Sequence, residues 1–405
     1  MSLPKLSNVS ADYLEALADE LAIPESRYLQ AQNRYNTIGK WLQRPTSTIA
    51  EYKPNIYVQG SFRLGTAIRP LNESEEYDID AVCAFELLDR DDITQAELKK
   101  KVGYELEQYK NTQNIKKPLS EGRRCWTLHY ADDAKFHMDV LPALEQDDSE
   151  YRLLLEKQDL DTNWLNTSIS ITYRNHPYFN EISDEWPRSN PKGYSSWFIS
   201  KMNTEFLRKK RAIFENRSSI DAYNSVEDVP DYKIRTPLQS AIMILKRHRD
   251  NLFVDNPDDK PISIIISTLA AHSYNNEQSV GEALFQILLK MQNFIEKRGE
   301  QYIIRNPTDP LENFADKWLE NPNKKAAFFD WHHQCTEDFS SFTEFTNLQS
   351  ITDILAPRVG EVLVEKSIQR LHKQNSTLRS AVTTTATNLS FPNTARSPEK
   401  PRGFA

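Results

Sequence analysis

Cysteine, glycine and long apolar runs are scarce in this chain of 405 residues. Its three cysteines cannot form a disulfide framework, and Cys83 and Cys125 lie in apolar, strand-like runs, so we interpret both as packed thiols in a reducing cytosol. The best apolar run, residues 262–271, is far shorter than the roughly 20 residues that a membrane-spanning helix needs. Residues 1–20 lack the basic start and apolar centre of a signal peptide. These absences predict a cytoplasmic protein without a membrane partner.

Positive charge is also in deficit, with 50 Lys and Arg against 58 Asp and Glu, a formal net charge of -8. An acidic total argues against a protein that mainly coats nucleic acid, although it leaves room for a local basic groove. We therefore expect no obligatory nucleic-acid partner. The length suggests two domains or one two-lobed unit, and a monomer is the default expectation.

Expected helices and strands divide the chain into a mixed α/β first half and a helical second half. Apolar residues recur at helical spacing over residues 9–44, where Pro24 separates two helices. Residues 145–192 give no clear pattern. The first half is expected to hold strands 56–59, 78–85, 123–130 and 135–141, the last closed by Pro142, and helices 61–67 and 92–109, the second capped by Asp92 or Thr94. The second half is expected to hold helices 195–216, 236–251, 262–274, 280–296, 326–339, 348–355 and 358–372.

The stretch from Val58 to Thr66, followed by Asp78 and Asp80, carries most of the chemical information. A strand end runs into a Gly-Ser turn, whose backbone N–H groups and hydroxyl can bind phosphates. Side chains alternate along a strand, so Asp78 and Asp80 point to the same side, roughly 7 Å apart. Two like charges this close are costly to bury unless a divalent cation neutralises them. The pattern predicts metal-assisted chemistry on a nucleoside triphosphate.

A third carboxylate, Asp139, lies on a later strand. His137 shares its face, while Phe136, Met138 and Val140 share the other, as is typical of a strand with one buried face and one face turned to a cleft. Three carboxylates beside a phosphate-binding turn predict a site for two Mg²⁺ ions, for which Mn²⁺ can substitute.

The predicted roles follow from this arrangement. Asp78 and Asp80 would hold both ions, and Asp139 would complete the shell of the ion that activates the attacking hydroxyl. Asp139 would also help to take the hydroxyl proton. Gly60 and Ser61, next to Gln59, would bind the β- and γ-phosphates.

Further candidates each have a structural alternative. Lys246 is either a phosphate contact or part of a solvated helix end in the run Lys246 to Arg249. Tyr194 either stacks on a base or packs in the core of the lobe junction. Arg63 either approaches the triphosphate or pairs with Glu75 or Glu76.

The order of Gly60-Ser61, Asp78-Ile79-Asp80 and Asp139 resembles the signature of the DNA polymerase β-like nucleotidyltransferase superfamily. The wider context is similar to one branch, the bacterial cGAS/DncV-like nucleotidyltransferases of anti-phage (CBASS) systems. The resemblance is carried, in order, by residues 59–66, 77–80, 136–142, 189–198, 238–250 and 306–318.

This resemblance implies an α+β fold, with a nucleotidyltransferase core and an α-helical lobe like that of oligoadenylate synthases around the active-site cleft. It implies that ATP, GTP or other triphosphates are joined into a cyclic di- or trinucleotide with release of pyrophosphate. The product would activate an effector that damages the infected cell. The expected division is residues 1–50 as helices that pack on both lobes, 51–192 as the catalytic core, 193–372 as the helical lobe and 373–405 as a disordered tail.

Partners other than the triphosphates stay open. In several related systems a ubiquitin-like conjugating enzyme of the E1/E2 type joins the C-terminal residue of the cyclase to a target, which would be Ala405 here. The alternative is a terminus without a role. The resemblance also leaves open activation by a regulatory peptide-binding protein.

Two other functions share the three carboxylates. One is a template-independent transferase that acts on RNA or protein, although a long RNA would need a basic track and the net charge is -8. The other is a nucleotide-binding scaffold that retains the fold. A scaffold gains little from three clustered carboxylates, so an active enzyme is the expected reading.

Overall fold

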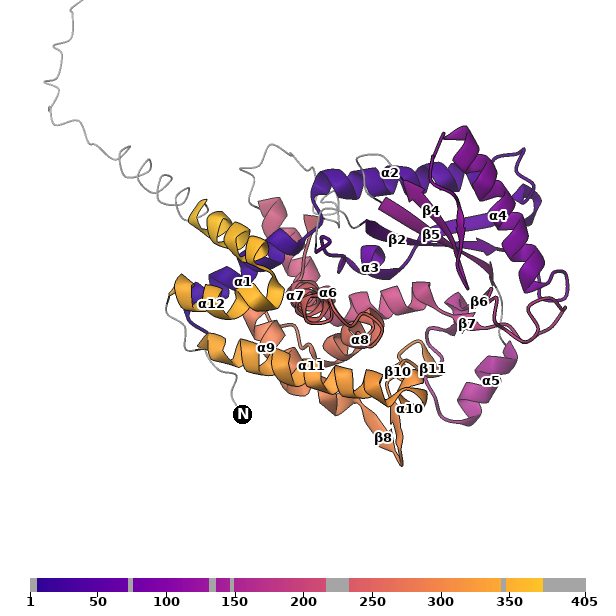
Figure 1. Cartoon of the computed structure of the whole chain (residues 1–405). Helices are drawn as coiled ribbons and strands as arrows, with labels where there is room; N and C mark the ends of the chain where they lie inside the picture. The colour runs from indigo at the N-terminus through magenta and orange to yellow at the C-terminus, as the bar shows by residue number, and fades with distance from the viewer. Residues whose placement is uncertain are drawn as a thin grey trace, which may run out of the picture.

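The computed structural model describes residues 6–71, 76–130, 136–145, 149–215, 233–343 and 347–373. Figure 1 shows a core built around a sheet, with α2 and α4 beside it, next to a lobe built from helices. The α+β fold expected from the sequence is confirmed. The expected tail beyond residue 373 lies outside the described residues.

The core contains a seven-stranded mixed sheet with the order β1-β2-β5-β4-β3. In addition, β6 pairs with the C-terminal end of β5, and β7 pairs with β6. The central strands β2 and β5 are parallel, while the other pairs in the described sheet are antiparallel. The strands are β1 (Pro54–Val58), β2 (Tyr77–Phe85), β3 (Ser120–Glu121), β4 (Trp126–Tyr130), β5 (Phe136–Glu145), β6 (Ile169–Ile171) and β7 (Arg188–Ser189).

Alternation along β2 and β5 gives the sheet two different faces. Ile79 and Met138 belong to a large apolar core that also includes side chains of α2 and α4. Val82 and Leu141 on the opposite face form a smaller apolar cluster. Because side chains alternate, Asp80 shares this second face, near the start of its strand. The predicted division of β5 into an apolar and a polar face is confirmed.

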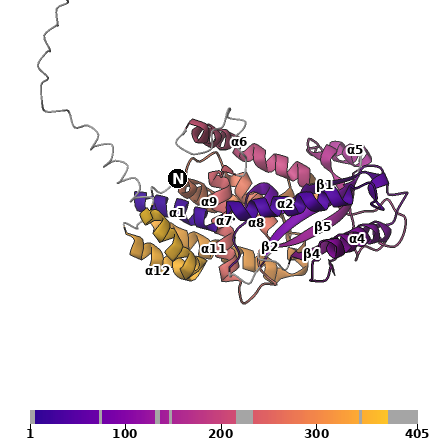
Figure 2. The same ribbon diagram turned by 90° about the horizontal axis from the view of Figure 1, so that it is seen from above.

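The two N-terminal helices belong to different parts of the molecule. Helix α1 packs against α7 and α9, whereas α2 packs against β1 and α4. Figure 2 shows α2 lying along the sheet, with α4 and α12 toward opposite ends of the molecule. None of the helices in the described ranges is both long and apolar enough to cross a membrane. The helices are α1 (Asn8–Leu21), α2 (Glu25–Leu42), α3 (Gly60–Leu64), α4 (Gln95–Thr112), α5 (Ser149–Lys157), α6 (Pro191–Glu215), α7 (Pro237–Leu252), α8 (Ser263–Ser273), α9 (Val280–Lys290), α10 (Lys317–Glu320), α11 (Pro322–Ser340) and α12 (Leu348–Val359).

The prediction that Pro142 closes its strand is wrong, because β5 continues to Glu145. On one side of β5 the pairing passes from β4, whose first residue Trp126 lies opposite Val140, to β6, whose last residue Ile171 lies opposite Ala143. Thr172 N–H donates to the Pro142 carbonyl on that side. Pro142 therefore lies at a change of partner, where its missing N–H removes no ladder hydrogen bond.

Two short hairpins in the helical half were not predicted. The helix expected over residues 280–296 ends at Lys290, and a 3₁₀ turn and the hairpin of β8 and β9 follow. The next hairpin pairs β10 with β11. Strands of two to five residues with charged side chains carry no recognisable period of two, so the sequence gives little signal for them. These strands are β8 (Glu296–Arg298), β9 (Gln301–Ile303), β10 (Arg305–Asn306) and β11 (Asp309–Asn313).

Candidate active site

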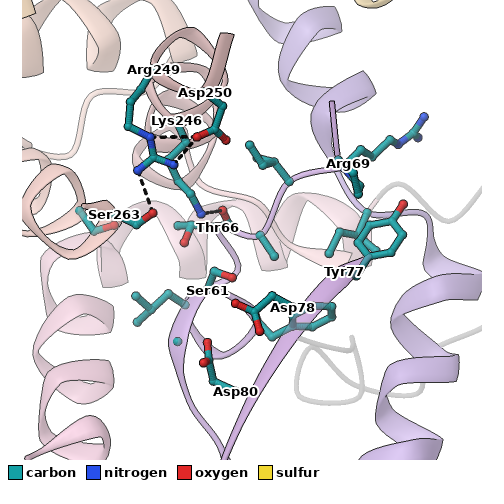
Figure 3. Close-up of a pocket in the computed structure, with 18 of the residues that line it drawn as sticks. Ser61, Thr66, Arg69, Tyr77, Asp78, Asp80, Lys246, Arg249, Asp250 and Ser263 are labelled. Carbon is teal, nitrogen blue, oxygen red and sulfur yellow. Dashed lines mark hydrogen bonds and ion pairs between the residues drawn. The ribbon is translucent and has the colours of Figure 1, made fainter. Parts of the chain in front are cut away.

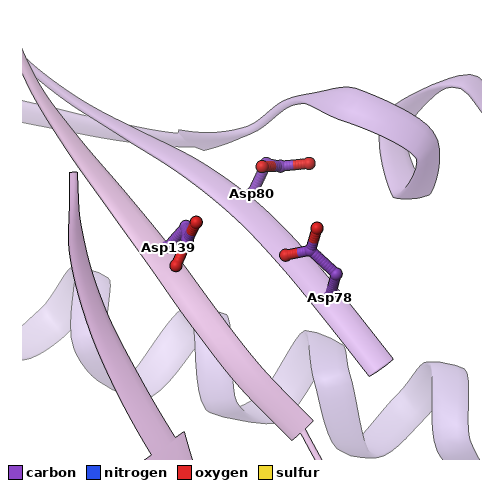
Figure 4. A group of neighbouring side chains, drawn as sticks. All are labelled: Asp78, Asp80 and Asp139. Atoms are coloured by element: carbon purple, nitrogen blue, oxygen red, sulfur yellow. The ribbon is translucent and has the colours of Figure 1, made fainter. Parts of the chain in front are cut away.

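Three carboxylates meet on the polar face of the two central strands. Asp80 lies directly opposite Asp139 in the parallel register, and Asp78 lies opposite His137. One carboxylate oxygen from each of the three aspartates lies within 4.8 Å of the others. Figure 4 shows the three side chains pointing to one side of β2 and its neighbour β5. The sequence predicted that Asp78 and Asp80 share a face, and the register brings Asp139 beside them.

This cluster has the electrostatics of a cation site. Burial raises the pKa of Asp80 to about 7, and the negative charges of Asp78 and Asp139 add to this effect. Like charges that are held together stay costly until a cation binds between them. The donor atoms are all carboxylate oxygens, which suit a hard divalent cation such as Mg²⁺. These three residues therefore fit a metal site.

The Gly60–Ser61 turn packs directly on Asp80. Gly60 has a φ of 63°, and a Cβ at this position would lie only 2.1 Å from Asp80 Oδ2. The N–H of Gln59 donates to the Asp80 carbonyl at 2.9 Å. A residue with a side chain at position 60 would be strained and would also push the carboxylate aside. The chain thus needs glycine here to keep the turn and Asp80 together.

Neighbouring side chains orient the outer two carboxylates. His137 Nε2 lies 3.1 Å from Asp78 Oδ1, and this hydrogen bond is the main cause that raises the pKa of His137. Thr127 Oγ donates to Asp139 Oδ1 at 2.6 Å, and the thiol of Cys125 donates to Asp139 Oδ2 at 3.3 Å. Cys125 was expected within a strand, but β4 begins only after it, and its half-buried thiol bonds to the acidic cluster.

A cavity of about 590 Å³ joins the acidic cluster to the helical lobe. Asp78, Asp80 and Ser61 line its core side, and α7 and α8 line the other. Figure 3 shows Lys246 and its neighbours on α7 facing the turn across this space. Lys246 Nζ donates to the Thr66 carbonyl at 3.0 Å. Burial lowers the pKa of Lys246 to about 8, and the charge of Arg249 adds to this shift.

The run from Lys246 to Arg249 is not a solvated helix end, because all four residues are buried. Lys246 and Arg249 line the cavity. Arg247 donates to the carbonyls of Arg69 and Pro70, and the ring of His248 bonds to a carboxylate of α11. The same wall also contains cationic and polar residues that were not predicted as site residues. They are Arg249, Lys260, Ser263 and Ser267. No short motif marks them, because they come from α7, α8 and the segment between these helices, and the packing of the whole lobe brings them together.

The cavity lining does not include three of the predicted nucleotide- and phosphate-binding residues. Arg63 Nε donates to Ser195 Oγ at 3.2 Å, and Arg63 does not line the cavity. Among the described residues it is not in the ion pairs of Glu76, and its other expected partner, Glu75, lies outside the described residues. Tyr194 is 7% exposed, and its hydroxyl bonds to Thr268 at 2.8 Å. The stacking prediction for Tyr194 does not fit this structure, since its ring packs in the core of the helical lobe. The Gln59 side chain also lies outside the cavity lining.

Comparison with known proteins places this geometry among nucleotidyltransferases. Residues 54–142 match the nucleotidyltransferase domain of the cyclic GMP-AMP synthase DncV-like family. This stretch holds the Gly60–Ser61 turn and all three aspartates. The chain is 30% identical over 322 residues to a c-di-GMP synthase of Roseivirga ehrenbergii, which covers 79% of this chain and 76% of that relative.

Two further comparisons extend over more of the chain. It is 25% identical over 382 residues to the cyclic dinucleotide synthase CdnG of Bradyrhizobium diazoefficiens, covering 90% of this chain and 85% of that relative. The solved structure of the Bradyrhizobium diazoefficiens CD-NTase CdnG in complex with GTP superposes with a TM-score of 0.69 at 21% identity, over 90% of this chain and 99% of that one. The fold of both lobes is therefore shared.

Proposed function

Since the chain belongs to the DncV-like nucleotidyltransferase family, we propose that this enzyme joins two nucleoside triphosphates into a cyclic dinucleotide. The observation that carries the proposal is one cavity lined by Asp78 and Asp80, beside Asp139, by the Gly60–Ser61 turn and by Lys246. Carboxylates for cations and a cationic wall for phosphates are the two parts that nucleotidyl transfer needs.

The chain's own residues would act in the following way. Ser61 and Lys246 would bind the triphosphate of one nucleotide, and Asp139 would help to accept the proton of the attacking ribose hydroxyl. That oxygen would form a bond to the α-phosphorus while the bond to pyrophosphate breaks. A second transfer of the same kind would close the ring, so that two molecules of pyrophosphate leave for each product.

Asp78, Asp80 and Asp139 would hold Mg²⁺, or Mn²⁺ in its place. Bound cations would neutralise the triphosphate and lower the pKa of the attacking hydroxyl. Relatives named as a c-di-GMP synthase and as a synthase solved with GTP support GTP as at least one substrate. A cyclic trinucleotide and other bases remain outcomes of the test below.

The further partners are also proposals. The product would act on an anti-phage effector in the cytoplasm, where triphosphates are abundant. Conjugation at Ala405 falls outside the described residues, as does the whole tail. We further propose residues 51–192 as the catalytic unit and 193–372 as the unit that closes over it.

The experiment incubates the pure full-length protein with four labelled triphosphates and Mg²⁺ or Mn²⁺, and then adds phosphatase. A phosphatase-resistant product that Asp80→Asn fails to make supports cyclic dinucleotide synthesis. Label that appears only after RNA or protein is added would establish the template-independent transferase instead. Triphosphate binding without any product, with or without these additions, would support a scaffold.

A further inference from the structure

Side chains of α7 hold the backbone that follows the Gly60–Ser61 turn. Gln239 Nε2 donates to the Leu64 carbonyl at 2.8 Å. Lys246, two helical turns later on the same face, donates to the Thr66 carbonyl. Arg247 continues the series with the two carbonyls of residues 69 and 70. The helical lobe therefore binds the main chain of residues 64–70 at successive points.

This segment is connected to the turn by local backbone hydrogen bonds. The N–H of Thr66 donates to the Ser61 carbonyl at 2.9 Å, and that of Gly65 donates to the Phe62 carbonyl at 3.3 Å. Gly65 has a φ of 66°, and a Cβ there would lie 2.4 Å from Gln239 Nε2, so glycine allows the close approach of α7. A shift of Gln239 would consequently be transmitted through α3 to Ser61.

The other end of the turn is fixed by the catalytic core. Gly60 leaves no space between the turn and Asp80, and the N–H of Gln59 is bonded to the Asp80 carbonyl. The turn is thus held by β2 at its start and by α7 at its end. Gln239 is only 6% exposed, so water cannot easily replace its amide at the Leu64 carbonyl.

We propose that Gln239 is a positioning residue for the triphosphate, acting through the Gly60–Ser61 turn. Gln239 does not line the cavity, whereas Ser61 and Lys246 do. This role rests on the proposed function of the same cavity. It makes the affinity for the triphosphate depend on a contact between the two lobes.

Gln239 has a second role that a test must keep separate. Its Oε1 accepts from the N–H of Thr236 at 2.8 Å and completes the capping box at the start of α7. Gln239→Glu keeps this acceptor, since glutamate suits the same capping position, but replaces the donor to Leu64 with a carboxylate oxygen. Gln239→Met removes both groups at similar volume. Thr236→Ala weakens the cap and leaves the Gln239–Leu64 bond in place.

The experiment measures KM and kcat for GTP, equilibrium GTP binding and the melting temperature of the full-length protein and these three variants. We expect both Gln239 variants to raise KM by about three- to tenfold or more, with a smaller change in kcat. Thr236→Ala should lower the melting temperature while its KM stays near that of the wild type.

The proposal is overturned if Gln239→Glu and Gln239→Met keep the wild-type KM. It is also overturned if Thr236→Ala raises KM as much as they do. A wild type that binds GTP but forms no product would refute the proposed function instead. The binding comparison would then decide the role of Gln239 by itself.

Discussion

At the scale of single residues, the site depends on a contact that only glycine permits. Gly60 and Asp80 are so close that the turn proposed to bind phosphate packs directly on a carboxylate proposed to bind a cation. Lys246 faces them from the helical lobe with a pKa that burial has lowered to about 8. Small changes at these three residues should therefore alter activity far more than stability.

Gly60→Ala should abolish product formation. The new Cβ would displace the Asp80 carboxylate, in addition to the strain of a positive φ, which costs about 1–2 kcal/mol. Gly299→Ala is the matched control, because Gly299 has a φ of 60° and no atom of the described residues outside its own neighbourhood would lie within 4 Å of the added Cβ. Initial rates and unfolding free energies would separate the two effects. Equal losses of activity in both variants would show that backbone strain, not the clash, matters.

Triphosphate affinity should fall as pH rises above about 8. The folded-state pKa of Lys246 lies below the usual value for lysine, so this side chain loses its proton and its charge early as pH increases. Arg249, Asp250, Asp80 and Asp78 are the charged groups that act on it. KM for GTP should increase by up to about tenfold for each pH unit above the pKa, because only the charged form attracts phosphate. Lys246→Arg, which stays charged, should flatten this profile, and an identical profile in that variant would contradict the assignment.

At the scale of helices and strands, local patterns predicted faces and caps, but not cross-strand neighbours. Alternation alone placed Asp78 with Asp80 and separated Asp139 from the apolar face of its strand. The bonds from Thr127 and Cys125 to Asp139 depend on the register between β4 and β5, which no local pattern encodes. The prediction that Tyr194 stacks on a base does not fit the structure for a related reason. Only the packing of the lobe decides which aromatic rings reach the cavity.

Helix α4 offers a test of a local prediction. Thr94, one of the two expected caps, accepts from the N–H of Glu97 and forms a capping box with it. Thr94→Ala should lower the unfolding free energy by about 1 kcal/mol, because one N–H at the helix start loses its partner. Activity should not change, since α4 covers the sheet face opposite the aspartates. Chemical denaturation measures the first effect and initial rates the second; a loss of activity without loss of stability would contradict this account.

At the scale of the whole molecule, residues near the start of the chain complete both lobes. Helix α1 is buried in the helical core, whereas α2 lies on the catalytic core. Their junction bonds to the segment that follows the Gly60–Ser61 turn, where Arg69 donates to the carbonyls of Leu21 and Ala22. The sequence predicted both helices and the two-lobed division. It gave no signal that their junction, α7 and the turn converge on residues 64–70.

Removing one apolar side chain from α1 should therefore destabilise the helical lobe, although most of that lobe lies far from α1 in the sequence. Leu17 is fully buried in that lobe's core, so Leu17→Ala should cost about 2–5 kcal/mol of unfolding free energy. Leu29→Ala on α2 is the control, because Leu29 is 40% exposed and should change little. Hydrogen exchange of α7 and α9 would report the weakened lobe. Unchanged protection there would show that α1 is not part of its core.

The central claim is that the three clustered aspartates drive the closure of a cyclic dinucleotide. Mass spectrometry of the product formed from GTP and ATP tests it most directly, because the cyclic product is lighter by one water than the linear dinucleotide that carries one 5′-phosphate. The control is Asp330→Asn, which removes the charge of an exposed aspartate on α11. The wild type and this control should yield the cyclic mass, and a folded Asp139→Asn variant should yield none. Linear chains from the wild type, or the same cyclic mass from Asp139→Asn, would contradict the account.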